Sequence, residues 1–310
     1  MDTIGIVGAG LIGRAWAIVF ARAGFAVKIW DVAPAATAAA RGFIADRLPE
    51  LRAAGLLRDT PDAVLARITP VETLAEAVTG VIHVQENGPE RIPEKTALFA
   101  EMDRLAAPGV ILASSTSGIP ASAFTEALQG RARTLVAHPV NPPYLIPVVE
   151  LCPAPWTDPA TVARTRSLME RAGQVPATVN REVAGFVLNR LQIALVSEAM
   201  RLVADGIISA EDVDATVKHG LGLRWSFMGP LETIDLNAPG GLADYLGRYG
   251  ALYTEVQEET QPLPITQPLI DTLHAARRAA LPMDGQADRQ AWRDRRLMAL
   301  LAHKAGRDEG

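Results

Sequence analysis

The sequence predicts an α/β fold in which a doubly wound, mostly parallel sheet is followed by an all-α domain. Three observations support this prediction. A glycine-rich turn joins a strand-like run to an apolar helix within residues 4–23, strand-like and helix-like segments alternate as far as residue 182, and only helical patterns follow. Since 310 residues are many for one hydrophobic core, we expect two domains, residues 1–182 and residues 183–310.

The composition limits the class of protein and of partner. With 49% apolar and 21% charged residues, the chain resembles an ordinary globular protein, and a net charge of −5 argues against nucleic acid or an anionic membrane as partner. Cys152 is the single cysteine, which suits a reducing compartment. No metal-ligand spacing, secretion signal or apolar run of membrane-spanning length is seen, so we expect a cytoplasmic protein without a metal site.

The first element pair carries the most informative motif. After a strand-like run at residues 4–7, Gly8, Gly10 and Gly13 give the spacing G-x-G-x-x-G, and an apolar helix continues to residue 23. A second strand follows at residues 25–31. In a Rossmann-type turn the first glycine permits the tight bend, the second lets a pyrophosphate approach, and the third lets the helix pack on the strand. The N-terminal domain is therefore predicted to bind a dinucleotide.

The start of this helix and the end of the second strand complete the predicted cofactor site. The backbone amides of Leu11 and Ile12 lie at the helix N-terminus, where unpaired N–H groups attract phosphate. Asp31 lies 18 residues beyond Gly13 and can accept hydrogen bonds from ribose hydroxyls. Because residues 32–34 hold no arginine for a 2′-phosphate, NAD is favoured over NADP.

The remaining elements follow in order. Helical patterns cover residues 35–57 (interrupted at Pro49), 74–78, 91–106, 121–128 and 158–172, with strand-like runs beside residue 70 and at 81–85, 110–114, 134–138, 148–152 and 177–179. Beyond residue 182 we expect a long helix over residues 184–206, another starting at Ser209, and further helices near 241–260 and 287–304. Alternation in the first part predicts βαβ units and a parallel sheet.

Polar side chains lie at several predicted strand ends. Glu86 and Asn87 close one strand, residues 114–117 close a second, and His138 closes a third. Ligands of open α/β sheets bind beyond the carboxyl ends of the strands, so these residues are expected to share one cleft.

Glu150 is the other unusual polar residue, because it lies inside the apolar run "PVVELC". A carboxylate in such a run is costly unless it has a partner. His138, twelve residues earlier across a proline-rich turn, is the natural partner. This pair would fix the imidazole tautomer and raise its basicity. His83 lies within a strand and is interpreted as packed, not catalytic.

Five segments, "GAGLIG", "SSTSGI", "HPVNPPYLIPVVEL", "AGFVLNR" and "MGPLETID", resemble the 3-hydroxyacyl-CoA dehydrogenase family in order and spacing. Within it the sequence is most similar to the branch of λ-crystallin and L-gulonate 3-dehydrogenase. The resemblance implies an NAD-dependent dehydrogenase acting on a small molecule, and a homodimer formed through the helical domain.

The resemblance also implies roles for four residues. His138 would be the general acid/base, and Glu150 would orient it. Ser117 and Asn189 would hydrogen-bond near the reacting oxygen.

Two more residues, Glu86 and Lys95, fall near positions where family members contact the cofactor. Ser115 stands where the family often has asparagine, a change that leaves Ser117 in register.

The substrate is the point at which alternatives remain. The stretch that meets coenzyme A in acyl-CoA enzymes of this family has neither lysine nor serine here, and Arg224 stands where those enzymes usually have a small or apolar residue. An arginine can bind a carboxylate through two hydrogen bonds, which favours a free 3-hydroxy acid. An acyl-CoA stays open, as does carnitine, whose cation Tyr144, Trp225 or Phe227 could contact. The intact catalytic set argues against a purely structural role.

Overall fold

The described part of the chain, residues 1–260 and 262–306 of a computed structural model, contains one eight-stranded sheet. The strands are β1 (Thr3–Val7), β2 (Ala26–Trp30), β3 (Ile68–Pro70), β4 (His83–Glu86), β5 (Ile111–Ser114), β6 (Thr134–Pro139), β7 (Val148–Pro153) and β8 (Val175–Thr178). Their order is β3-β2-β1-β4-β5-β6-β7-β8, and every pairing is parallel except that of β6 with β7. The predicted doubly wound, mostly parallel sheet is confirmed.

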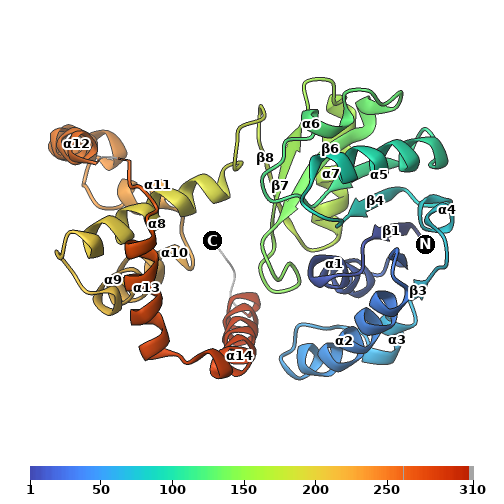
Figure 1. The fold of residues 1–310 in the computed structure, drawn as a ribbon, viewed down its shortest axis with the longest axis horizontal. Coiled ribbons are helices and arrows are strands. Elements are labelled where there is room, and N and C mark those ends of the chain that lie inside the picture. Colours follow the sequence, from blue (N-terminus) through green and yellow to red (C-terminus); the bar gives the residue numbers. More distant parts are fainter. Residues whose placement is uncertain (261, 307–310) are drawn as a thin grey trace. The chain divides into compact units, whose positions relative to one another are not determined.

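Helices cover both faces of this sheet (Figure 1). On one face lie α1 (Leu11–Arg22), α2 (Pro34–Ala53), α3 (Pro61–Leu65) and α7 (Pro159–Arg171), and on the other α4 (Leu74–Val78), α5 (Ile92–Leu105) and α6 (Ser122–Thr125). A hydrophobic core lies on each face of the sheet, and alternate residues of a strand point into the two cores. Leu135 and Ala137 of β6 belong to the first core, and Val136 belongs to the second. A short 3₁₀ turn, Arg131–Arg133, precedes β6.

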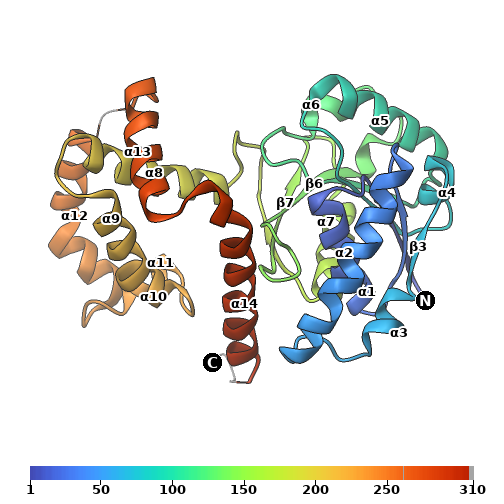
Figure 2. The same ribbon diagram turned by 60° about the horizontal axis from the view of Figure 1, so that its bottom comes forward.

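A second compact unit, residues 191–292, is helical throughout its regular structure (Figure 2). It contains most of α8 (Leu188–Ala204), then α9 (Ala210–Thr216), a π-helical turn (Val217–Leu221), α10 (Gly222–Trp225), α11 (Pro230–Asp235), α12 (Gly241–Glu259) and α13 (Gln267–Ala280). An ion pair of Arg277 with Asp214 joins α13 to α9. No helix formed by the described residues is long and apolar enough to cross a membrane.

The last helix, α14 (Gln286–Ala305), follows a 3₁₀ turn (Met283–Gly285), and from Arg293 onward it groups with the sheet unit. Met298 is buried in the core that α1 and α2 share, with Leu297 and Leu301 packed beside it. The expected division into residues 1–182 and 183–310 therefore differs from these units, because apolar side chains of α14 return to the first core.

Several helices differ from the sequence-based expectation. Pro49 lies inside α2 without ending it, since Leu48 and Leu51 on either side are fully buried and tertiary packing outweighs the missing backbone N–H. The start of α8 is Leu188, not residue 184, because Gly185 and Phe186 take positive φ angles. Helices α3, α10, α11 and α13 were not expected at all.

Candidate active site

The strands β4, β5 and β6 lie side by side, so their carboxyl ends bring Glu86, Ser114 and His138 to one edge of the sheet. This is the arrangement expected from the polar strand ends. The loops that leave β4 and β5 carry further polar residues of the site, among them Glu90 and Ser117.

His138 and Glu150 form the central contact. The antiparallel register of β6 and β7 sets the two residues directly opposite each other, and His138 Nδ1 lies 2.8 Å from Glu150 Oε2. Both side chains are buried, at 5% and 2% exposure. Because a carboxylate only accepts, Nδ1 carries the proton in the neutral imidazole, and Nε2 makes no hydrogen bond among the described residues. The pairing inferred from the sequence is present.

The second oxygen of Glu150 is held by backbone. The N–H groups of Val187 and Leu188, at the start of α8, donate to Oε1 at 2.8 and 2.9 Å. Burial acts to raise the pKa of Glu150, but the hydrogen bonds from His138 and from these two amides outweigh it and hold the pKa below its ordinary value. The carboxylate is thus charged and fixed, which orients the imidazole.

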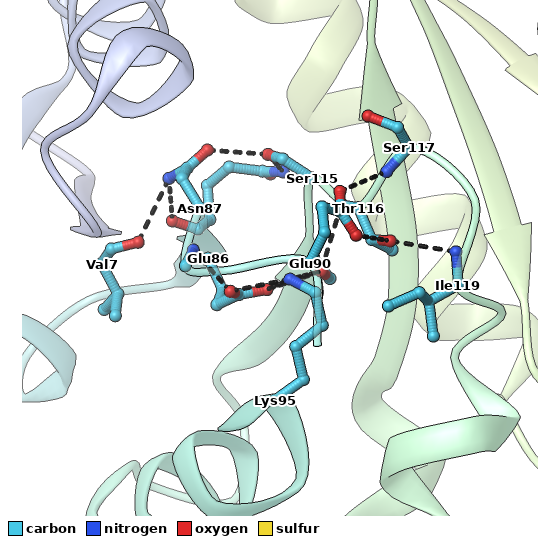
Figure 3. Close-up of polar contacts among 12 residues, drawn as sticks. Val7, Glu86, Asn87, Glu90, Lys95, Ser115, Thr116, Ser117 and Ile119 are labelled. Carbon is cyan, nitrogen blue, oxygen red and sulfur yellow. Dashed lines mark hydrogen bonds and ion pairs between the residues drawn. The ribbon is translucent and has the colours of Figure 1, made fainter. Parts of the chain in front are cut away.

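The loop that follows β5, residues 115–119, is called the serine loop here. Hydrogen bonds of its main chain and of the Thr116 side chain hold it in place (Figure 3). The N–H of Ser117 donates to Glu90 Oε1 at 2.7 Å, and the hydroxyl of Thr116 donates to Glu90 Oε2 at 2.6 Å. On the other side, Asn189 Nδ2 donates to the carbonyl oxygen of Ser117 at 2.6 Å. The Ser117 hydroxyl makes no hydrogen bond among the described residues and is exposed, so it is free for a ligand.

Glu90 is a site residue that the sequence reasoning missed. It lies in the loop that leaves β4, only four residues beyond Glu86, and the signal was an acid at the carboxyl end of a central strand. Its two oxygens hold two successive residues of the serine loop, which sequence spacing alone does not reveal.

Ser115 also has a definite place. Its hydroxyl accepts from Trp16 Nε1 at 3.0 Å and from Gln85 Nε2 at 2.7 Å, and donates to Asn87 Oδ1 at 2.8 Å. The Asn87 amide in turn donates to the Val7 carbonyl at 3.3 Å, as Figure 3 shows. The serine at this position therefore links the helix after the glycine turn to the ends of β1 and β4.

Glu86 and Lys95 lie beneath this loop. They are 0% and 1% exposed, and Lys95 Nζ lies 3.0 Å from both carboxylate oxygens. The Ser114 hydroxyl and the Gly88 N–H also donate to Glu86. The two charges are thus buried against each other. The expected contact of both residues with the cofactor stays a prediction. They support the loop that contains Glu90.

The glycine turn has the geometry that a dinucleotide needs. Gly8 has φ +92°, and a Cβ on Gly13 would lie 1.8 Å from the Gly8 oxygen, so only glycine permits this packing of helix on strand. Nothing lies within 4 Å of a Cβ built on Gly10, and no side chain caps the helix, whose first residues are Leu11 and Ile12. Open space beside uncapped amide groups fits a pyrophosphate.

Asp31 fits the ribose end of the same cofactor. Its Oδ2 accepts from the Ala9 N–H at 2.7 Å and its Oδ1 from the Ala33 N–H at 2.9 Å. Each carboxylate oxygen keeps a second lone pair for a hydroxyl donor. Asp31 thus binds the glycine turn and remains able to accept from a ribose.

Arg224 belongs to the helical unit, on α10. Its side chain is exposed and forms no hydrogen bond or ion pair with any residue that the structure describes.

Comparisons with known proteins agree with this arrangement. The family model described as 3-hydroxyacyl-CoA dehydrogenase, NAD binding domain, matches residues 3–183, and the model of the C-terminal domain matches residues 185–280. A lambda-crystallin homolog from Bos taurus is 44% identical over 306 residues, covering 97% of this chain and 95% of that protein. An L-carnitine dehydrogenase from Streptomyces griseus is 38% identical over 299 residues, covering 96% and 88%.

Among solved structures, 5-formyl-3-hydroxy-2-methylpyridine 4-carboxylic acid 5-dehydrogenase, an NAD⁺-dependent dismutase, superposes with a TM-score of 0.86. It is 30% identical, and the match covers 99% of this chain and 100% of that chain. The first domain is thus an NAD-binding domain, and the relatives include dehydrogenases that act on hydroxyl groups. The chain belongs to the 3-hydroxyacyl-CoA dehydrogenase family.

Proposed function

We propose that this protein is an NAD-dependent dehydrogenase that oxidises the C3 hydroxyl of a free 3-hydroxy acid to the 3-keto acid, with L-gulonate as the type of substrate. The observation that carries the proposal is the His138–Glu150 pair, whose 2.8 Å contact leaves imidazole Nε2 as a free base. A buried carboxylate behind a histidine is the arrangement that general acid–base catalysis requires.

The mechanism follows from the protonation state of this pair. NAD⁺, when bound, supplies the hydride acceptor. His138 takes the hydroxyl proton at Nε2, because Nδ1 already shares its proton with Glu150. Glu150 then stabilises the imidazolium, and its two backbone donors keep it in place.

Ser117 and Asn189 act on the substrate oxygen in this proposal. The main chain of Ser117 is held by Glu90 and Asn189, so its hydroxyl can be aimed without a large loss of conformational freedom. A donor fixed before the reaction stabilises developing charge on the oxygen better than one that must reorganise.

Arg224 supports a free carboxylate as the far end of the substrate. Its guanidinium has no acidic partner among the described residues, so it is free to pair with a ligand carboxylate. The relative named L-carnitine dehydrogenase keeps carnitine as the second candidate, and family members that act on acyl-CoA keep thioesters as the third.

A panel assay separates these three. Initial rates with NAD⁺ are measured for L-gulonate and other free 3-hydroxy acids, L-carnitine, and L-3-hydroxybutyryl-CoA. We expect NADH formation with a free acid, and Arg224→Ala to raise the KM for that acid about 100-fold. Arg248→Ala, another arginine of the helical unit, is the matched control and keeps the KM. Fast turnover of the thioester alone contradicts the free-acid proposal.

We also propose that the protein is a homodimer that uses the exposed apolar face of α12. This face carries Leu246, Tyr249, Leu252, Tyr253 and Val256, each 42–54% exposed. Their spacing places an apolar stripe along one side of a helix, and such stripes bury themselves against a partner. Light scattering is expected to give twice the monomer mass, and Leu252→Glu to give the monomer, whereas Glu255→Lys on the same helix leaves the mass unchanged.

A further inference from the structure

Phe186 has a backbone conformation that its side chain does not favour. Its φ is +51°, and it is the one residue other than glycine with positive φ in residues 1–260 and 262–306. It follows Gly185, which has φ +74°. A bulky residue in the left-handed region costs about 1–2 kcal/mol. Such strain persists only where surrounding contacts hold it, and it gathers at functional sites.

The backbone turn at Phe186 delivers two amides to the candidate base. Directly after it, the N–H groups of Val187 and Leu188 both donate to Glu150 Oε1. An extended residue at this position would send the following amides elsewhere. The left-handed turn thus anchors the carboxylate that orients His138.

The ring of Phe186 contacts the other member of the pair. It is fully buried, at 0% exposure, and its centroid lies 5.5 Å from that of His138 with 48° between the planes. Ring and imidazole are thus packed together at the border of an apolar cluster that contains Val136 and Cys152. An imidazole packed against a neighbouring ring and bonded at Nδ1 has little freedom to rotate.

We propose that Phe186 is a positioning residue for His138: its left-handed backbone aims two amides at Glu150 while its ring fixes the plane of the imidazole. The two parts act together, because loss of either lets the imidazole turn and lose the Nδ1–H tautomer. The kinetic consequence rests on the proposed function, whereas the state of the imidazole does not.

The first test compares Phe186→Leu with Gly206→Ala. Leucine keeps an apolar side chain and the strained backbone but removes the ring. Gly206 has φ +70° at the end of α8 with open space around it, so alanine there adds strain of the same kind away from the pair. We expect Phe186→Leu to lower kcat about 10- to 100-fold with the KM values within about twofold. Its primary deuterium isotope effect on kcat should rise, because hydride transfer becomes slower.

Gly206→Ala should lower the melting temperature and leave kcat and the isotope effect unchanged. If Phe186→Leu behaves in the same way, Phe186 serves only to stabilise the fold and the proposal is overturned.

The second test needs no substrate. Nitrogen-15 NMR of the imidazole groups reports their tautomers, and the His138 signals are those that vanish in His138→Gln. The native protein should show the Nδ1–H tautomer, and Phe186→Leu a mixture of the two. If none of the candidate substrates is turned over, this measurement still decides: an unchanged tautomer in Phe186→Leu refutes the positioning role, and a mixture supports it.

Discussion

Glu90 and Ser117 are joined through the main chain: the N–H of Ser117 donates to Glu90 Oε1 at 2.7 Å, while the other oxygen of Glu90 accepts from Thr116. An exposed acid in one loop therefore sets the position of a hydroxyl in the next. Since Asn189 binds the carbonyl of the same serine, Ser117 is held on both sides of its Cα.

Glu90→Ala is expected to lower kcat about tenfold or more, because the serine loop loses two acceptors and the Ser117 hydroxyl is no longer held. Glu90→Gln keeps one acceptor oxygen and should lose less. Steady-state kinetics of both variants test this order, with Glu94→Ala on the exposed start of α5 as control. Equal activity in the native protein and Glu90→Ala contradicts a role for Glu90 in holding Ser117.

Glu150→Gln should lower kcat by about three orders of magnitude while leaving the Kd for NADH unchanged. The two backbone amides at Oε1 select the glutamine oxygen, which turns its NH₂ group toward His138. That group donates to Nδ1, so the proton moves to Nε2 and the base is lost. Rates are measured by NADH absorbance and binding by quenching of fluorescence. A kcat close to that of the native protein is the outcome that removes Glu150 from the mechanism.

Features that depend on neighbouring residues, or on a clear pattern of residue types, can be predicted from the sequence. The glycine turn follows from residues 8–13, and the His138–Glu150 pair follows from a charge inside an apolar run with one nearby partner. Contacts that depend on the meeting of distant loops could not be predicted this way. Glu90 reaches Ser117 across 27 residues, and no periodicity marks either residue.

Two further differences have tertiary causes. Phe186 has a side chain that disfavours positive φ, and only the folded surroundings hold it there. Residues 293–306 have a helical pattern that shows no preference for either domain, and the packing of Met298 in the first core assigns them. Local propensity fixes the type of an element better than it fixes the partner against which the element packs.

Asp31→Ala should weaken NADH binding at least about tenfold and bring the Kd values for NADH and NADPH closer together. The alanine variant loses both the acceptor for the ribose and the anchor of Ala9. Asp31→Asn keeps an oxygen for one of these bonds but removes the negative charge. The Kd of this variant for NADPH therefore reports how strongly the Asp31 carboxylate repels a 2′-phosphate. Fluorescence titrations of each variant with NADH and with NADPH give the ratio of the two Kd values. If this ratio is unchanged in both variants, Asp31 does not face the ribose.

His83 makes the stability of the fold depend on pH. It is fully buried, its Nε2 lies 2.9 Å from Gln85 Oε1, and Nδ1 has no partner in the described part of the chain. Burial lowers the pKa of His83 to about 4 from an ordinary value of 6.5. Between these two values the unfolded chain binds a proton that the folded protein excludes, so stability falls as the pH falls.

The size of this loss of stability follows from how far the pKa of His83 is lowered. The loss begins near pH 6.5, is complete near pH 4, and is on the order of 3 kcal/mol. His83→Gln keeps a donor for Gln85 without a titrating group, so its free energy of unfolding should change less between pH 7 and pH 5 than that of the native protein. His219→Gln, at an exposed position, should retain the native pH dependence. Urea unfolding at both pH values measures these free energies. If the free energy of unfolding changes equally between pH 7 and pH 5 in His83→Gln and in the native protein, some other group causes the acid sensitivity.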